Sequence, residues 1–371
     1  MRNVGLDVLR FVAVVMVIFC HLHTAPPMPP SALAFLTSGG GLGVTLFFVL
    51  SGFLVSGLIF GEFDRRGGVD VGRFLVRRGF KLYPPYWALL ALNTVVALAS
   101  LTPADAGEFW TSLGIRFLFL QNYFPRLFDH TWTLAVEEHF YLLLAGLTAL
   151  LLRPRSPRPF AFVPAFFLLT ALVCGAARVW AAAGGGELGP ADWAKTQYHI
   201  DGLFFGVWLS YLRCYHDLEG RLRAVPTWLL LAAGCVAAAW LPHVVLQIGP
   251  FGRAPAAWIR YLGAGLVVLA AFRLVESRIA AVRGMAFLGQ TSYSTYLWHG
   301  WVNVLVVNVL ERLAGRCDPW LYIVAYPVGA FVVGVVMHRL LEAPSMWLRD
   351  RWLPRGEGPP AASRSEGAGR S

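Results

Sequence analysis

The sequence has little charge: Asp, Glu, Lys and Arg make up 14% of its 371 residues, whereas 57% are hydrophobic. So little polar surface excludes an ordinary water-soluble domain of this length. The five cysteines are scattered and form no CxxC pair, so we expect neither a disulfide framework nor a metal site. The motifs GxxxxGK[ST] and GxGxxG are also missing, which disfavours nucleotide hydrolysis and dinucleotide binding. The composition predicts an integral membrane protein.

Long apolar runs recur along the chain, each near the ~20 residues that a helix needs to cross the hydrocarbon layer. The runs are continuously apolar rather than alternating, which predicts helices and not a barrel. We therefore predict an all-α, polytopic membrane helix bundle with about ten transmembrane helices. The expected spans are 5 to 24, 41 to 60, 85 to 101, 132 to 152, 160 to 183, 202 to 213, 227 to 246, 257 to 275, 287 to 310 and 320 to 341.

Lys and Arg are distributed unevenly over the connecting segments. If the N-terminus is inside, the inner segments hold 21 of the 31 Lys and Arg residues and the outer segments hold six. Cytoplasmic loops carry this excess, so we expect both termini in the cytoplasm and a multi-pass protein of the cytoplasmic (inner or plasma) membrane. The same topology, together with anionic inner lipids, accounts for the net charge of +10 without a nucleic-acid partner.

The sequence predicts a single domain followed by a short C-terminal extension. Residues 1–353 are expected to form a single transmembrane domain. Residues 354–371 are rich in Pro, Gly, Ser and Arg and have almost no apolar content, which predicts a disordered cytoplasmic tail. The first apolar run is interrupted by Arg10 and no small-residue cleavage pattern follows it, so we keep it in the mature chain.

The first apolar run, LDVLRFVAVVMVIFCHLH, contains ionisable residues that a simple membrane anchor does not need. Arg10 and His21 are eleven residues apart, which places them on one helical face about 16 Å apart, with Asp7 near the same stripe. An ionisable group inside a span costs at least about 2.5 kcal/mol, so such groups face the bundle interior and are functional candidates. The alternative for Arg10 is a structural ion pair with Asp7 near the inner interface.

A carboxylate is expected at the depth of His21. The fourth predicted helix begins with HTWTLAVEEHFYLL and runs from outside to inside, so Trp132 and Glu137 enter the membrane near the level of His21. A histidine and a carboxylate at matching depth can form the base and its orienting partner that general-base catalysis requires.

A basic cluster precedes the third predicted span, in the stretch GRFLVRRGFKLYPPYW. Arg73, Arg77, Arg78 and Lys81 would share one helical face, which suits a polyphosphate ligand. The alternative is positive-inside anchoring, with the following aromatic residues as an interfacial belt.

These stretches together resemble the acyltransferase-3 family of membrane O-acyltransferases. An Arg, ten residues and a His in the first helix are a hallmark of that family, and six further stretches follow in the family's order over roughly residues 5 to 345. They are FFVLSGFLVSG, RRGFKLYPPYW, WTLAVEEHFYLL, HIDGLFFG, LGQTSYSTYLWH and LEAP.

The resemblance implies an enzyme that moves an acyl group, commonly acetyl, from cytoplasmic acyl-coenzyme A (acyl-CoA) to a hydroxyl of a carbohydrate, glycolipid or glycosylated metabolite. By matching motif, His21 is the base, Arg10 its partner and Glu137 the essential acid, and Trp132 beside it is expected to bind the acceptor substrate. Arg78 and Lys81 fall where the family places residues that meet coenzyme A, although Lys81 occupies a position more often held by Arg. The implied partners are the bilayer, acetyl-CoA as a co-substrate rather than a bound cofactor, and a hydroxylated acceptor.

Polar residues also begin and interrupt later predicted spans. His199 and Asp201, at the start of the sixth, are candidates for the lining of an outer acceptor vestibule, although helix capping explains Asp201 equally well. His299 lies within the ninth, where we expect a packed, hydrogen-bonded side chain. Glu342, at the end of the last, is expected to form a structural ion pair.

A proton-coupled transporter of a small molecule is the main alternative, because buried Asp, Arg, His and Glu in a ten-helix bundle also suit such carriers. The sequence shows no repeat between its halves and no clear pair of Gly/Pro-broken spans, which favours the enzyme. A scaffold without chemistry would not need Arg10, His21 and Glu137 inside lipid.

Overall fold

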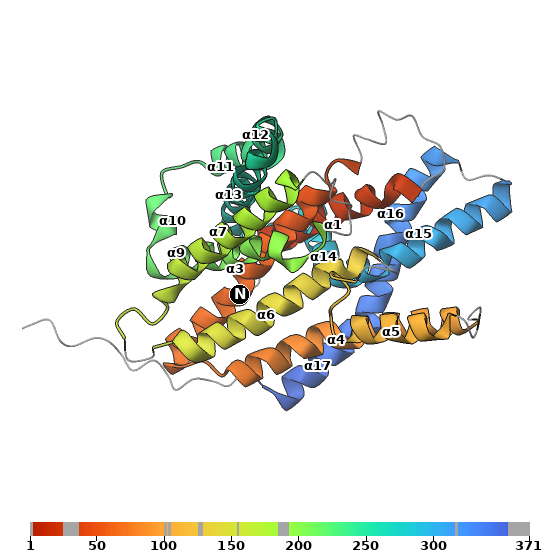
Figure 1. The fold of residues 1–371 in the computed structure, drawn as a ribbon, viewed down its shortest axis with the longest axis horizontal. Coiled ribbons are helices and arrows are strands. Elements are labelled where there is room, and N and C mark those ends of the chain that lie inside the picture. The colour runs from red at the N-terminus through yellow and green to blue at the C-terminus, as the bar shows by residue number, and fades with distance from the viewer. Residues whose placement is uncertain are drawn as a thin grey trace, which may run out of the picture.

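The computed structural model describes residues 3–24, 37–99, 102, 105–124, 129–153, 156–184, 193–315 and 318–354. All regular secondary structure within these ranges is helical, which confirms the all-α prediction (Figure 1). The main helices are α1 (Val4–Cys20), α3 (Gly40–Arg66), α4 (Val71–Leu98), α5 (Ala106–Phe117), α6 (Trp132–Leu151), α7 (Phe162–Ala183), α9 (Ile200–Tyr215), α10 (Leu218–Arg221), α11 (Thr227–Cys235), α12 (Leu241–Leu246), α13 (Arg253–Phe272), α14 (Ala280–Gln290), α15 (Ser292–Ala314), α16 (Pro319–Met337) and α17 (Ala343–Trp352).

Six helical segments of the described chain are long and apolar enough to cross a membrane, so the protein is a multi-pass membrane protein. They are Gly40–Arg66, Trp132–Leu151, Phe162–Ala183, Thr227–Leu246, Gly249–Phe272 and Pro319–Trp352. The count of ten spans and the cytoplasmic position of the termini stay predictions. The expected tail lies outside the described residues except for Pro354.

The remaining predicted spans correspond to helices that are short or polar. Helices α1 and α9 have 17 and 16 residues, and α15 carries several polar side chains along its length. The predicted span 85 to 101 falls on α4 as far as Leu98, and α4 starts at Val71 and continues through Pro84 and Pro85. Residues 100 and 101 of that span lie outside the described residues. The basic cluster and the following apolar segment are therefore one continuous helix.

Two long helices are interrupted near prolines. A π-helical turn, Val236–Trp240, joins α11 to α12, and a second, His338–Glu342, joins α16 to α17. Pro242 and Pro344 each stand two positions after the last residue of these turns, and proline removes a backbone donor and crowds the preceding turn. Beyond the second turn, α17 packs on α4.

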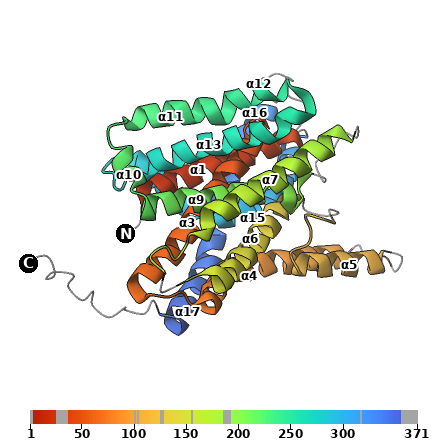
Figure 2. The same cartoon turned by 60° about the vertical axis from the view of Figure 1, so that its left-hand side comes forward.

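The helices around the bundle centre position the candidate site. Helix α1 packs on α3, α14 and α15, while α4 packs on α6, α15 and α17. Figure 2 shows α11 and α12 on the outside of the bundle and α5 projecting from it. Helices that are far apart in the sequence, such as α1 and α15 or α4 and α17, therefore lie side by side around the candidate site.

Helices α3 and α9 cross very closely, because glycines lie at the contact. A Cβ atom on Gly52 would clash with the carbonyl of Leu203, and one on Gly206 would clash with the carbonyl of Val49. Small residues allow this approach of two backbones, which is a main source of helix association in membranes. This crossing holds the α3 wall of the central cavity in place.

We predict that Gly52→Ala destabilises the protein, because the added methyl group must push α3 and α9 apart. Overpacking of this kind costs about 1–3 kcal/mol. Gly57→Ala on the same helix is the matched control, since its Cβ would lie 3.5 Å from Ser210 Oγ, an ordinary contact. Thermal unfolding in detergent should show a lower midpoint for Gly52→Ala than for Gly57→Ala, and equal midpoints would contradict the close crossing.

Candidate functional site

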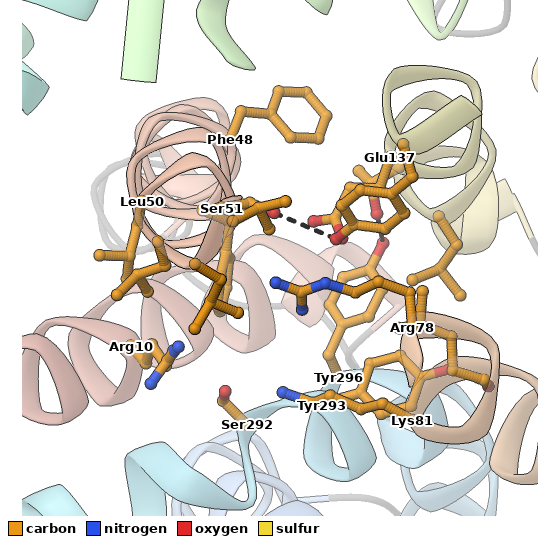
Figure 3. Close-up of a pocket in the computed structure, with 18 of the residues that line it drawn as sticks. Arg10, Phe48, Leu50, Ser51, Arg78, Lys81, Glu137, Ser292, Tyr293 and Tyr296 are labelled. Atoms are coloured by element: carbon orange, nitrogen blue, oxygen red, sulfur yellow. Dashed lines mark hydrogen bonds between the residues drawn. The ribbon is translucent and has the colours of Figure 1, made fainter. Parts of the chain in front are cut away.

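A cavity of about 410 Å³ opens between α1, α3, α4, α6, α15 and α17 (Figure 3). Helix α3 supplies its apolar wall. The residues of that wall are Val44, Phe47, Phe48, Leu50, Leu54, Val55 and Leu58. The other helices supply polar side chains, so the cavity has one apolar side and one charged side.

The charged side of the cavity is strongly cationic. Arg10 from α1, Arg78 and Lys81 from α4 and Arg349 from α17 face one carboxylate, Glu137 from α6. Figure 3 shows Arg10 and Arg78 on opposite sides of the space. Four cations against one anion, with an apolar wall behind them, form a site for an anionic ligand that also has an apolar part.

Arg10 is held by Asp7, as the sequence alternative proposed. Its Nη1 donates to Asp7 Oδ1 at 2.7 Å, and Gln290 Nε2 donates to Asp7 Oδ2 at 3.3 Å. Asp7 is buried and Arg10 is partly exposed toward the cavity. The ion pair and the functional position are therefore compatible: Asp7 orients Arg10 while Arg10 lines the cavity.

Glu137 lines this cavity and accepts a hydrogen bond from a tyrosine hydroxyl, which a serine contacts in turn. Tyr141 OH donates to Glu137 Oε2 at 2.7 Å, and Ser51 Oγ lies 3.1 Å from the same hydroxyl (Figure 3). The Arg78 guanidinium lies over the Tyr141 ring, 5.4 Å from its centre. Glu137, Tyr141 and Arg78 thus form one connected polar group on the cavity wall.

His21 lies outside this cavity, in a cluster of three imidazoles. Its ring centre is 4.7 Å from that of His299 and 6.3 Å from that of His130. Its Nδ1 lies 2.8 Å from the carbonyl of Val17. A carbonyl can only accept, so Nδ1 carries the proton and Nε2 of the neutral ring is the basic nitrogen.

His299 is fully buried in the same cluster, which confirms the packed, hydrogen-bonded side chain expected from the sequence. Its Nδ1 donates to the carbonyl of Tyr296, and its ring centre is 4.7 Å from that of His130. Its Nε2 has no hydrogen-bond partner among the described residues. The three rings do not have the geometry of a metal site, and no other group of three His, Cys, Asp or Glu within the described ranges has it either.

A polar column connects the cavity with the histidine cluster. Polar side chains recur at spacings of three or four residues on two helices, which places them on one face of each. The column consists of Tyr141, Glu137, Thr133 and His130 on or just before α6, and of Ser292, Tyr296 and His299 on α15. On α1, Arg10 lies at the cavity end of the column and His21 at the other end.

Thr133 and Tyr296 meet in the middle of this column. Thr133 Oγ1 lies 2.6 Å from Tyr296 OH, and that hydroxyl also contacts the carbonyl of His130. Both side chains line the cavity. They separate the space that holds Glu137 from the cluster that holds His21, so the sequence-predicted pairing of His21 with Glu137 is not formed as a direct contact among the described residues.

The four basic residues of α4 are divided between two places. Arg78 and Lys81 line the cavity, whereas Arg73 and Arg77 reach the end of α17. Arg73 donates to the carbonyl of Pro354. Arg77 donates to the carbonyl of Leu353 and, at 2.8 Å, to Asp350 Oδ1.

Trp132 and His199 lie together behind the apolar wall. Their ring centres are 4.8 Å apart, and Phe48, which lines the cavity, is 6.0 Å from Trp132 and 5.9 Å from His199. His199 Nε2 lies 2.5 Å from the carbonyl of Trp193. The two predicted acceptor-binding residues are thus neighbours of each other and of Phe48.

Asp201 takes part in a buried network that the sequence did not reveal. Arg178 from α7 donates to both carboxylate oxygens at 2.9 and 2.5 Å, and Tyr261 from α13 donates to Oδ1 at 3.0 Å. The side chain of Asp201 is 0% exposed. The carboxylate ties α7, α9 and α13 together, and it forms neither the predicted vestibule lining nor the alternative helix cap.

Glu342 forms the expected structural pair. Its Oε2 lies 2.9 Å from His338 Nδ1 and accepts from Ser294 Oγ at 2.8 Å. The side chain is 1% exposed. These contacts fix the second π-helical turn against α15.

Sequence reasoning missed several residues of the site, among them His130, Thr133, Tyr296 and Arg349. His130 and Tyr296 carry a usable signal, because each continues the three- or four-residue spacing of polar groups on its helix. Thr133 follows the same spacing. Arg349 carries no such signal, since its place at the cavity depends on the turn that directs α17 toward α4.

Comparisons with known proteins agree with the motifs. A family model described as an acyltransferase domain matches residues 3–339. O-acetyltransferase OatA of Staphylococcus aureus strain NCTC 8325 / PS 47 is 26% identical over 364 residues, which cover 92% of this chain and 56% of that protein. A putative O-acetyltransferase of Staphylococcus aureus strain COL is 26% identical over 365 residues, with coverage of 92% and 56%. The chain thus spans about half the length of these relatives. No solved structure matches it.

We predict that Asp201→Ala acts on stability. Removing one partner of a buried ion pair leaves an uncompensated charge and costs about 3–5 kcal/mol, whereas replacing both partners by apolar residues costs far less. Asp201→Leu combined with Arg178→Met should therefore melt at a higher temperature than Asp201→Ala alone in a detergent unfolding assay. If the single variant melts like the unmodified protein, the network is not structural.

Proposed function

Because the chain belongs to the acyltransferase-3 family and is an acyltransferase, we propose that it transfers an acetyl group from cytoplasmic acetyl-CoA to a hydroxyl group of a carbohydrate or glycoconjugate. His21 is the proposed general base. The observation that carries the proposal is the polar column, which leads from a cationic cavity to the histidine cluster.

The chemistry of the donor matches the cavity. Coenzyme A has a pyrophosphate and a phosphate monoester at one end and a thioester at the other, joined by a flexible arm with amide groups. Arg78 and Lys81 form no hydrogen bond or ion pair with other described residues, so their charges are available to phosphate oxygens. The apolar wall of α3 would take the arm.

Helix α1 sets the distance between the two ends of the donor. The eleven residues from Arg10 to His21 correspond to about 16 Å along the helix axis. With Arg10 at the phosphate end, an extended arm can follow the column and bring the thioester toward His21. Glu137, held through Oε2 by Tyr141, would accept a hydrogen bond from an amide of the arm through its other oxygen.

The chemical step is a direct acyl transfer. Nε2 of His21 takes the proton of the acceptor hydroxyl while the oxygen attacks the thioester carbonyl carbon. The bond from that carbon to sulfur then breaks, and the coenzyme A thiolate leaves and takes the proton from His21. The carbonyl of Val17 holds the ring in the required tautomer throughout.

The two ends of the column suit the two substrates. The cationic cavity lies at the end where α1 begins, which the distribution of Lys and Arg predicts to be cytoplasmic. Acyl-CoA is a cytoplasmic donor, so this orientation in an inner or plasma membrane is consistent with the proposal. The acceptor would then reach His21 from the opposite end, past Trp132 and His199.

We predict that His21→Ala lowers the rate of transfer by about 10²–10⁴-fold, the usual contribution of general-base catalysis. The measurement is release of coenzyme A thiol together with mass spectrometry of acetylated surface glycans in cells that contain or lack the protein. His243→Ala, an exposed histidine on α12, is the matched control and should keep full activity. Unchanged transfer by a folded His21→Ala protein would exclude His21 as the base.

We also predict that Arg78→Ala raises the KM for acetyl-CoA by about tenfold or more while kcat changes little. Charge-assisted hydrogen bonds contribute about 1.5–3 kcal/mol, and each 1.4 kcal/mol is tenfold in affinity. Arg73→Ala, on the same helix but directed to Pro354, should raise KM less. Equal KM values for the two variants would show that the cavity does not bind the donor.

A further inference from the structure

Helix α17 places one more guanidinium at the cationic cavity, and its neighbours orient that group. Arg349 and Met346 line the cavity. Arg349 Nε donates to Asp350 Oδ1 at 2.9 Å, and Arg349 Nη2 donates to Asp350 Oδ2 at 2.9 Å. This paired contact uses one edge of the planar group. The opposite edge, which includes Nη1, makes no hydrogen bond with the described residues.

Asp350 links Arg349 to α4. Its Oδ1 also accepts from Arg77 Nη2 at 2.8 Å, so one carboxylate bridges two guanidinium groups. The Asp350 side chain is 49% exposed and that of Arg349 is 13% exposed. The bridge therefore lies at the rim of the cavity, where α17 and α4 meet the surroundings.

Several contacts hold α17 in this position. Ser345 Oγ donates to the carbonyl of Phe80, and the rings of Phe80 and Trp352 lie edge to face at 6.0 Å. Arg77 also donates to the carbonyl of Leu353. Because the helix is fixed at both of its ends, Arg349 is oriented before any ligand arrives, and little side-chain entropy remains to be lost on binding.

We propose that Arg349 binds the ribose 3′-phosphate of the acyl-CoA donor and that Asp350 and Arg77 are positioning residues for it. The free edge of a guanidinium presents two N–H groups in parallel, which matches two oxygens of a phosphate monoester. The proposal rests on the proposed donor and deepens it by naming the residue that distinguishes a coenzyme A thioester from thioesters that lack the 3′-phosphate.

The position of Arg349 selects this phosphate over the pyrophosphate. Arg78 lies farther inside, over the ring of Tyr141 and next to Glu137, whereas Arg349 lies beside a half-exposed carboxylate at the rim. The thioester must point toward His21, so the nucleotide end of the donor points toward the rim. The monoester on the ribose is the part of coenzyme A that reaches α17.

The test measures binding of coenzyme A and of 3′-dephospho-coenzyme A to the full-length protein in nanodiscs by isothermal titration calorimetry. We expect Arg349→Ala to weaken binding of coenzyme A by about tenfold and to leave binding of the dephosphorylated form unchanged. The unmodified protein should prefer coenzyme A by a similar factor, and Arg349→Ala should lose that preference.

Arg351→Ala is the matched control. Arg351 lies on the same helix and stacks at 5.5 Å over the exposed Trp347 ring, away from the cavity lining. It should bind both probes like the unmodified protein. Arg349→Lys keeps the charge without the fork and should recover part of the preference, and it serves as the reporting variant if Arg349→Ala is poorly folded.

The outcomes separate this inference from the proposed function. If Arg349→Ala binds both probes like Arg351→Ala, or loses affinity for both equally, Arg349 does not bind the 3′-phosphate. If the unmodified protein binds neither probe, the donor itself is wrong and the proposed function fails. Full retention of the preference for coenzyme A by folded Arg349→Ala, or by Arg349→Lys where Arg349→Ala does not fold, likewise overturns the assignment.

Discussion

A charged side chain in the membrane interior must have a partner or a polar space, and this constraint organises the protein. Arg178 and Asp201 satisfy it by pairing completely, with Tyr261 as a third member. Arg10 satisfies it in part through Asp7 and in part by facing the cavity. In the first arrangement, both charges are neutralised by the contact that holds the helices together. The second leaves charge for a ligand, and this difference separates the structural polar groups from the functional ones.

The apolar and glycine-rich parts of the fold make the polar column possible. Helix α3 lies so close to α9 at Gly52 and Gly206 that no side chain fits between them, and an adjacent face of α3 forms the apolar wall of the cavity. A helix that is fixed by this contact does not collapse onto the charged side. The space therefore persists without a ligand, and the side chains of α4 and α6 stay apart across it.

The sequence predicted the fold class, the family and the cationic pair Arg78 and Lys81, because each of these depends on composition or on residues close together in the chain. It did not predict the partition of the basic cluster, since Arg73 and Arg77 differ from Arg78 only through the contact of α4 with α17. It placed His21 and Glu137 at one depth, but Glu137 lines the cavity, whereas His130, seven residues earlier, lies beside His21. Counting residues from the start of a predicted span did not place these two side chains accurately enough along the membrane normal to show that they do not pair. The ion pair of Asp201 was missed for a similar reason, because its partner Arg178 is 23 positions away in the sequence and on another helix.

The contact between Thr133 and Tyr296 is also relevant to the electrical insulation that the membrane must provide. A continuous wet channel from the cationic cavity to the histidine cluster would let protons and small ions leak and would discharge the energised bilayer. Between the two, the hydroxyl groups of Thr133 and Tyr296 are in mutual contact, and that of Tyr296 also contacts the carbonyl of His130. In the proposed reaction the donor arm would have to displace this contact to bring its thioester to His21. A donor and an acceptor could then meet from opposite sides without a permanent aqueous path through the bilayer.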